Sequence, residues 1–193
     1  MVFAALTAAS CQSNEESKVE FKEKIVLPKP FKSHDKIEVM PGLTFDVLNW
    51  GKGADSLSSV IILRSDTARN SSTAFNLEIE GKYIETFNTD MDTDGNPEII
   101  IYTTSNKKYS PANVYCFEYN GKEPSKIRFP DLTDKTNKQY KGKDKFYIHD
   151  GKLRREFDLF DNMEDEKAKP VGKKVVEYSI RGNTFDITEI DGN

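Results

Sequence analysis

An oxygen-rich run of nine residues, DMDTDGNPE at positions 90–98, is the part of this sequence best suited to chemistry. Its three aspartates stand at alternate positions, and a glutamate closes the run at the start of an apolar segment. Four carboxylates this close repel one another, and a Ca²⁺ that binds their oxygens removes the repulsion. Gly95 allows the tight turn that such a wrap requires. The run therefore predicts a structural calcium site, with the ligands Asp90, Asp92, Asp94, Asn96 and Glu98.

The spacing of this run resembles the calcium loop of FG-GAP repeats, in which the last acid comes four positions after the third aspartate and a β-strand follows. An EF-hand is less compatible, because the twelfth position is Ile101, where an EF-hand has a bidentate glutamate. FG-GAP repeats recur along a chain, whereas this sequence has one copy, so we do not expect a full β-propeller. The alternative interpretation is a solvated acidic turn between two strands.

Short runs of β-branched and aromatic residues, separated by turn signals, follow one another from about Thr44 onward. The pairs Asn120-Gly121 and Asp150-Gly151 predict two-residue hairpin turns, and Gly182-Asn183 is a weaker signal of the same kind. No stretch has the pattern of a long amphipathic helix. We therefore expect an all-β fold, an antiparallel β-sandwich or barrel of about eight or more strands. Residues 130–142 are expected to form a long loop.

The start of the chain differs in character from the rest. Residues 1–11, MVFAALTAASC, are small and mostly apolar up to Cys11, and this segment resembles the end of a bacterial lipoprotein signal with Cys11 as the lipidated residue. Residues 12–37 are rich in Lys, Glu, Ser and Pro, which predicts a flexible tether. Residues 38–193 are then expected to form the β-sandwich domain. The expected location is the periplasm or the cell surface, with a lipid anchor in the outer membrane; the alternative is an unmodified, frayed N-terminus.

Two cysteines leave two interpretations open. If Cys11 carries lipid, Cys116 in the strand-like run VYCFEY is a small buried core residue. Alternatively, the two cysteines form a disulfide, and no lipid is needed.

Composition and motifs exclude several function classes. The 193 residues carry a net charge of -4, which gives no overall signature of nucleic-acid binding. No phosphate-binding loop or cofactor motif is present, and no nucleophile and base can be assembled, so we do not expect an enzyme. His149 stands beside Asp150 at a predicted turn, and a solvent-facing role is the simplest interpretation of it.

The polar loop TTSNKKYSP, residues 103–111, follows the strand that leaves the acidic run, and its lysines make a donor-rich tip suited to an acidic cleft. The order of acidic loop, PEIIIYTTS strand, serine-and-tyrosine loop and aromatic strand VYCFEYNG resembles bacterial periplasmic inhibitors of invertebrate-type lysozyme. The resemblance extends from about Thr44 to Ile187. In that family a β-sandwich inserts a loop of pattern SGxxY into the lysozyme cleft. The resemblance implies Ser105 and Tyr109 as contact residues, and the expected partner-binding set is Ser105, Lys107, Lys108 and Tyr109.

The sequence therefore leads to two expectations of function. The first is a lysozyme inhibitor that protects the bacterial cell wall by occluding the active-site cleft, with a Ca²⁺ ordering the strand and loop. The second is a calcium-stabilised adhesion or glycan-binding lipoprotein of the cell surface, which uses another face. Whether the chain forms a homodimer is left open.

Overall fold

The computed structural model describes residues 26–51, 57–105 and 111–191, which form twelve β-strands and one short helix. The elements are β1 (Phe31–Met40), β2 (Leu43–Trp50), β3 (Leu57–Asp66), β4 (Ser71–Glu80), β5 (Lys82–Thr89), β6 (Glu98–Thr104), β7 (Asn113–Glu118), β8 (Ser125–Ile127), α1 (Asp134–Asn137), β9 (Lys145–His149), β10 (Lys152–Leu159), β11 (Gly172–Arg181) and β12 (Thr184–Asp191). Within this part of the chain, no helix is long and apolar enough to cross a membrane.

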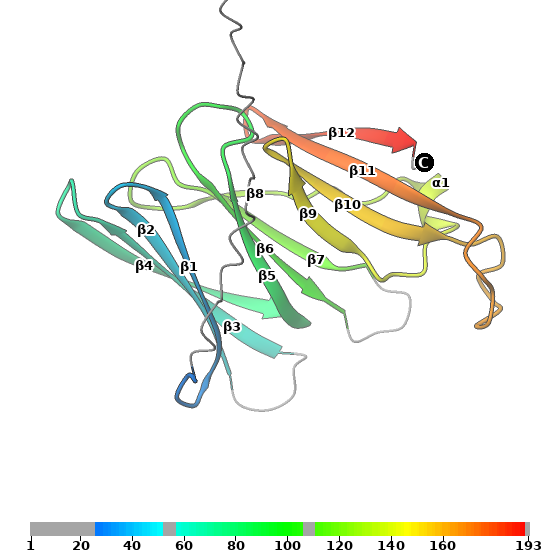
Figure 1. Ribbon diagram of the computed structural model, residues 1–193, viewed down its shortest axis with the longest axis horizontal. Coiled ribbons are helices and arrows are strands. Elements are labelled where there is room, and N and C mark those ends of the chain that lie inside the picture. Colours follow the sequence, from blue (N-terminus) through cyan, green and yellow to red (C-terminus); the bar gives the residue numbers. More distant parts are fainter. Residues whose placement is uncertain (1–25, 52–56, 106–110, 192–193) are drawn as a thin grey trace, which may run out of the picture.

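The strands form three antiparallel sheets of four, each built from four strands consecutive in the chain. We call β1–β4 the first sheet, β5–β8 the middle sheet and β9–β12 the third sheet; the green middle sheet lies between the other two in Figure 1. Such a four-stranded meander is also the form of a propeller blade. The expected all-β antiparallel sandwich of eight or more strands is confirmed.

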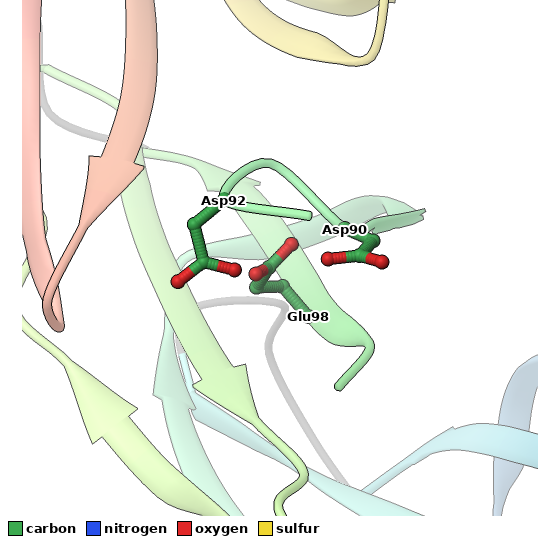
Figure 2. A group of neighbouring side chains, drawn as sticks. All are labelled: Asp90, Asp92 and Glu98. Atoms are coloured by element: carbon green, nitrogen blue, oxygen red, sulfur yellow. The ribbon is translucent and has the colours of Figure 1, made fainter. Parts of the chain in front are cut away.

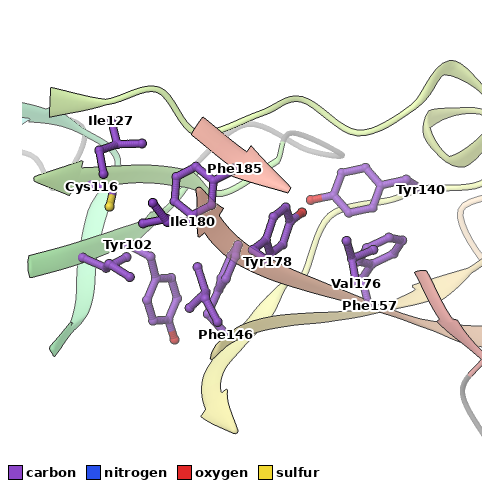
Figure 3. Packing of buried hydrophobic residues seen from close by; sticks show 12 residues of the cluster. Tyr102, Cys116, Ile127, Tyr140, Phe146, Phe157, Val176, Tyr178, Ile180 and Phe185 are labelled. Carbon is purple, nitrogen blue, oxygen red and sulfur yellow. The ribbon is translucent and has the colours of Figure 1, made fainter. Parts of the chain in front are cut away.

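The middle sheet is covered on both faces, and β6 lies at its centre. Successive side chains of a strand point to opposite faces, so Ile99 and Ile101 pack toward the first sheet, whereas Ile100 and Tyr102 pack toward the third sheet. Figure 3 shows the cluster between the middle and third sheets, which is rich in aromatic rings. Burial on both sides explains why β6 is a continuous apolar run rather than an alternating one.

Strand β1 corrects the predicted boundary between tether and domain. It begins at Phe31, inside the range 12–37 that the composition assigned to a flexible tether. The strand lies at the edge of the first sheet and pairs with β2 alone, and its exposed charged side chains, among them Lys36, act as edge protection. Those charges hide the apolar alternation of Ile37 and Val39, which pack against the core.

Two of the three predicted hairpin turns are confirmed. Asp150 and Gly151 have φ angles of 50° and 73°, and Gly182 and Asn183 have 54° and 60°, as the two-residue turn requires. The Asn120-Gly121 prediction is wrong, because residues 119–124 link β7 to the short β8 and only Gly121 of the pair has a positive φ. The predicted loop 130–142 contains α1, whose first turn is capped by the Thr133 side chain.

Cys116 lies at the centre of the core, as the interpretation of a small buried residue expects; its exposed fraction is 0%. Burial raises the pKa of its thiol, and the neighbouring carboxylates of Glu98 and Glu118 raise it further. Cys11, which carries the lipidation and disulfide predictions, lies outside the described residues.

We expect the Cys116 thiol to be inert in the folded protein, because the thiolate is the reactive form and access is closed. In a Cys11→Ser variant, which leaves Cys116 as the single cysteine, a disulfide reagent such as DTNB should label no thiol under native conditions and one thiol in guanidinium chloride. Rapid labelling of the native variant would contradict the packing described here.

Candidate functional site

The acidic run forms the loop of residues 90–97 between β5 and β6, and two residues with positive φ set its shape. Thr93 has φ 59° and Gly95 has φ 85°. The loop is held by its own carboxylates: Gly95 N–H donates to Asp90 Oδ2 at 3.2 Å, and Asn96 N–H donates to Asp94 Oδ1 at 2.8 Å. A glycine at position 95 supplies the left-handed conformation at low energetic cost. The backbone therefore folds back on itself and gathers the acids.

Two groups of three carboxylates result, and they share Asp92. Oxygens of Asp90, Asp92 and Glu98 lie within 4.8 Å of one another, as do oxygens of Asp92, Asp94 and Glu118. Figure 2 shows the first group side by side under the loop. Calcium–oxygen distances are about 2.3–2.6 Å, so two oxygens bound to one Ca²⁺ are up to about 5 Å apart. The spacing of each group suits a common cation.

Glu118 is a member of the site that the sequence did not reveal. It lies at the end of β7, directly opposite Glu98 in the register of β6 and β7. Like charges directly opposite in a sheet are destabilising. A lone acid in the aromatic run VYCFEY was the available signal. Its role depends on which strand pairs with β7 and in which register, and the pattern of one strand does not give that information.

Glu98 is completely buried and only half satisfied. Its Oε2 accepts hydrogen bonds from Thr89 Oγ1 at 2.7 Å and from Met91 N–H at 2.9 Å. Its Oε1 is buried and has no hydrogen-bond partner among the described residues, and the same holds for Asp92 Oδ1. Buried carboxylate oxygens normally have partners, because an unpaired buried charge is expensive. A bound cation would give both oxygens a partner.

The electrostatics of the site also favour a cation. Burial raises the pKa of Glu98, and the charges of Asp92 and Asp90 raise it further, against the lowering effect of its two hydrogen bonds. Burial likewise raises the pKa of Glu118, with added repulsion from Asp94, Asp92 and Asp90. Among the described residues, no Lys or Arg forms an ion pair with these five acids. Within the described part of the chain, the site is therefore a concentration of negative charge that no Lys or Arg ion pair offsets.

Asn96, which was predicted as a ligand, has a different contact in this structure. Its side-chain Nδ2 donates to Asp94 Oδ2 at 2.7 Å, in addition to its backbone contact with the same carboxylate. Asn96 therefore orients Asp94. The structure brings the other four predicted ligands into the two carboxylate groups.

The predicted partner-binding segment follows β6, whereas the acidic loop precedes it. Ser105 directly follows β6 and is half-buried, while Lys107, Lys108 and Tyr109 lie outside the described residues. The chain returns at Pro111, and the N–H of Ala112 donates to Asp144 Oδ2 at 2.9 Å. The acidic cluster and Ser105 thus lie at the two ends of β6. Ala112 is hydrogen-bonded to Asp144, the residue just before β9 of the third sheet.

The prediction that the chain is not an enzyme rests on the sequence alone. His149 was interpreted as a solvent-facing turn residue; in the structure its side chain is exposed, and its Nδ1 lies 2.9 Å from Asp150 Oδ2.

Comparisons with known proteins add no family: no protein-family model matches the chain, and a search of curated proteins found no match. The resemblance to lysozyme inhibitors therefore stays a prediction.

Proposed function

We propose that this chain is a calcium-stabilised, lipid-anchored inhibitor that presents the loop between β6 and β7 to the active-site cleft of a lysozyme. The observation that carries the proposal is the arrangement of the β6–β7 hairpin. Its open end holds two opposed glutamates, Glu98 and Glu118, within the acidic cluster, and its closed end is the loop of residues 105–112.

A cation at the open end would clamp the two strands together. The strands pair from Glu98↔Glu118 to Thr103↔Asn113, so the clamp and the loop are joined by one continuous ladder. The return of the loop has its own anchor at Asp144, which accepts from Ala112. A binding loop held at both ends loses less conformational entropy when it meets a partner. The two anchored ends support the proposal that this segment binds a partner.

The residues of the tip suit the cleft of a glycosidase. Lysozyme clefts contain catalytic carboxylates, with which Lys107 and Lys108 would form ion pairs. Tyr109 would occupy a sugar subsite with its ring, and Ser105 would hydrogen-bond at the mouth of the cleft. Inhibition is then occlusion of the cleft, and the chain itself performs no chemistry. Cys11 would carry the lipid that holds the protein at the outer membrane, facing the periplasm or the surface.

The proposal predicts inhibition of one lysozyme type by residues 12–193. We expect the Tyr109→Ala and Ser105→Ala variants to weaken inhibition, by about 30-fold for the tyrosine, because buried aromatic anchors contribute about 2 kcal/mol or more at interfaces. The measurement is cell-wall lysis by invertebrate-type, chicken-type and goose-type lysozymes with increasing inhibitor. Tyr147→Ala is the matched control, since Tyr147 is a half-exposed tyrosine on β9.

Absence of inhibition for all three enzymes would overturn the proposal. An inhibition that Tyr109→Ala and Tyr147→Ala reduce equally would show that the loop is not the contact. In either case, binding of polysaccharide in calcium would favour the second function, a surface adhesion or glycan-binding protein.

A further inference from the structure

A second site lies beside the acidic loop, in a cavity of about 430 Å³. Its walls come from four places: the turn between β1 and β2, the turn between β3 and β4, residues 95–97 of the acidic loop, and residues 119–122 after β7. The volume is in the range of small-ligand sites. The cavity is distinct from the predicted loop at 105–112, which lies at the opposite end of β6.

Two buried side chains in the wall have unused polar atoms. Arg64 and Tyr119 both line the cavity, and each is 3% exposed. Arg64 Nη1 and the Tyr119 hydroxyl have no hydrogen-bond partner among the described residues. Buried polar groups of folded proteins are nearly always paired, so two unpaired groups in one cavity wall indicate a ligand that pairs with them.

Arg64 is held in position by the half of its guanidinium that is paired. Its Nη2 donates to Asp66 Oδ2 at 2.7 Å, and the side chains of both residues are 4% exposed. Asp66 is itself fixed by Arg69, whose backbone N–H donates to Oδ1 at 3.0 Å and whose Nη1 lies 3.2 Å from Oδ2. The carboxylate of Asp66 is therefore occupied by two arginines, and Arg64 Nη1 remains for another acceptor.

The charges of the cavity wall favour an anion. Three basic residues line it, Arg64, Arg69 and Lys122, against the one acid Asp66. Met40 and Leu43 add apolar surface. The Tyr119 ring is packed edge-on against Phe45 at 4.7 Å, which fixes the direction of its hydroxyl. Burial, together with Glu123, raises the pKa of this hydroxyl despite the lowering effect of Arg64. The hydroxyl is thus a donor at all physiological pH values.

We propose that this cavity binds a small carboxylate-bearing ligand of the size of an acidic monosaccharide, whose carboxylate accepts hydrogen bonds from Arg64 Nη1 and the Tyr119 hydroxyl. A guanidinium and a phenol offer donors without an acceptor of comparable strength, so they select a carboxylate over a hydroxymethyl group. This inference goes beyond the proposed function, because it needs neither lysozyme binding nor a cation at the acidic cluster.

Glucuronate and glucose are the matched probes, since they differ in a carboxylate against a hydroxymethyl group. We expect glucuronate to bind in isothermal titration calorimetry, and glucose to bind at least tenfold more weakly, because its hydroxymethyl group cannot form the charge-assisted hydrogen bond that a carboxylate forms with Arg64 Nη1. Acetate is the third probe: it tests whether the carboxylate alone is enough, and binding as tight as that of glucuronate would contradict a sugar-sized ligand. Titrations in calcium and in EGTA keep the result independent of the acidic cluster, with which the cavity shares residues 95–97.

Tyr119→Phe is the decisive variant, because it removes only an unpaired hydroxyl and keeps the ring packed on Phe45. We expect an unchanged melting temperature and an affinity for glucuronate about five- to tenfold lower. Arg64→Met should lose binding altogether. Tyr147→Phe on β9 is the control and should bind as the parent does. Equal affinity of Tyr119→Phe and the parent, or no binding of glucuronate by the folded parent, would overturn the proposal.

Discussion

Calcium is expected to raise the melting temperature of this protein, and chelation with EGTA to lower it. A cation that binds only the folded state stabilises it by RT ln(1 + [Ca²⁺]/Kd), which is about 1–3 kcal/mol in a calcium-rich medium. For a chain of 193 residues this corresponds to a shift of about 2–12 °C. Differential scanning calorimetry in millimolar calcium and in EGTA measures the difference directly, and magnesium serves as the control for ionic strength.

Asp92→Asn should abolish this calcium effect, because Asp92 is the acid that the two carboxylate groups share. The same substitution removes one of five mutually repelling charges. The variant should therefore be less stable than the parent in calcium and at least as stable as the parent in EGTA. Asp131→Asn is the matched control, since the Asp131 side chain is 92% exposed and lies far along the chain from the loop. If calcium does not change the melting temperature of the parent protein, the prediction of a cation site is wrong.

Glu118→Gln tests the member of the site that only the structure identified. If Glu118 contributes an oxygen to the cation, we expect a calcium affinity about tenfold lower, as the loss of about 1.4 kcal/mol implies. Glu123→Gln is its control, because Glu123 is exposed in the loop after β7. Equal calcium affinity of the two variants would restrict the site to the loop and Glu98.

The fold could be predicted from the sequence wherever the pattern was local. Strands β2 to β12 correspond to apolar or alternating runs bounded by turn residues, and their antiparallel pairing follows from short connections. Strand β1 was not predicted, because its charged residues protect the edge of a sheet. Whether a strand lies at an edge depends on the assembled sheet and cannot be seen in the strand's own sequence. The arrangement of three sheets in layers could not be predicted from local patterns either. The unbroken apolar run of β6 was the one indication that this strand is covered on both faces.

The candidate sites divide in the same way. The acids of the loop could be predicted because they are neighbours in the chain and their spacing is itself the signal. Glu118 joins them through the register of two strands, and Arg64 and Tyr119 line one cavity because the first sheet packs against the middle sheet. Residues that are brought together by long-range pairing show no characteristic spacing in the sequence. Charged residues inside apolar strands, such as Arg64, are the signal that remains.

Arg155 and Asp144 form an ion pair between charged residues that are buried in the core. The second prediction with a large expected effect concerns this pair. Both side chains are buried, at 3% and 1% exposure, and Arg155 Nε donates to Asp144 Oδ1 at 2.6 Å. Arg155 Nη2 also donates to the Tyr140 hydroxyl at 3.2 Å, and that hydroxyl donates to Asp144. Burial alone would lower the pKa of Arg155, but Asp144 raises it and the net shift is upward. The Arg155 guanidinium therefore stays charged inside the core.

Arg155→Met is expected to lower the free energy of unfolding by about 3–5 kcal/mol, because it leaves the Asp144 carboxylate buried without its counter-charge. The melting temperature should fall by about 6–20 °C. Arg154→Met, one residue away, is the matched control: its partner Glu177 is a near-surface contact, so the cost should be about 1 kcal/mol or less. Guanidinium unfolding of both variants measures the two values.

A double variant, Asp144→Leu with Arg155→Met, separates loss of charge pairing from loss of packing. It removes both charges together, so it should recover a large part of the stability lost by Arg155→Met alone. Recovery of stability would not restore the contact between Asp144 and Ala112, which holds the return of the β6–β7 loop. If that anchor presents the loop to a lysozyme, the double variant should be stable and yet a weaker inhibitor than the parent. Stability and inhibition that recover together would show that the loop does not depend on Asp144.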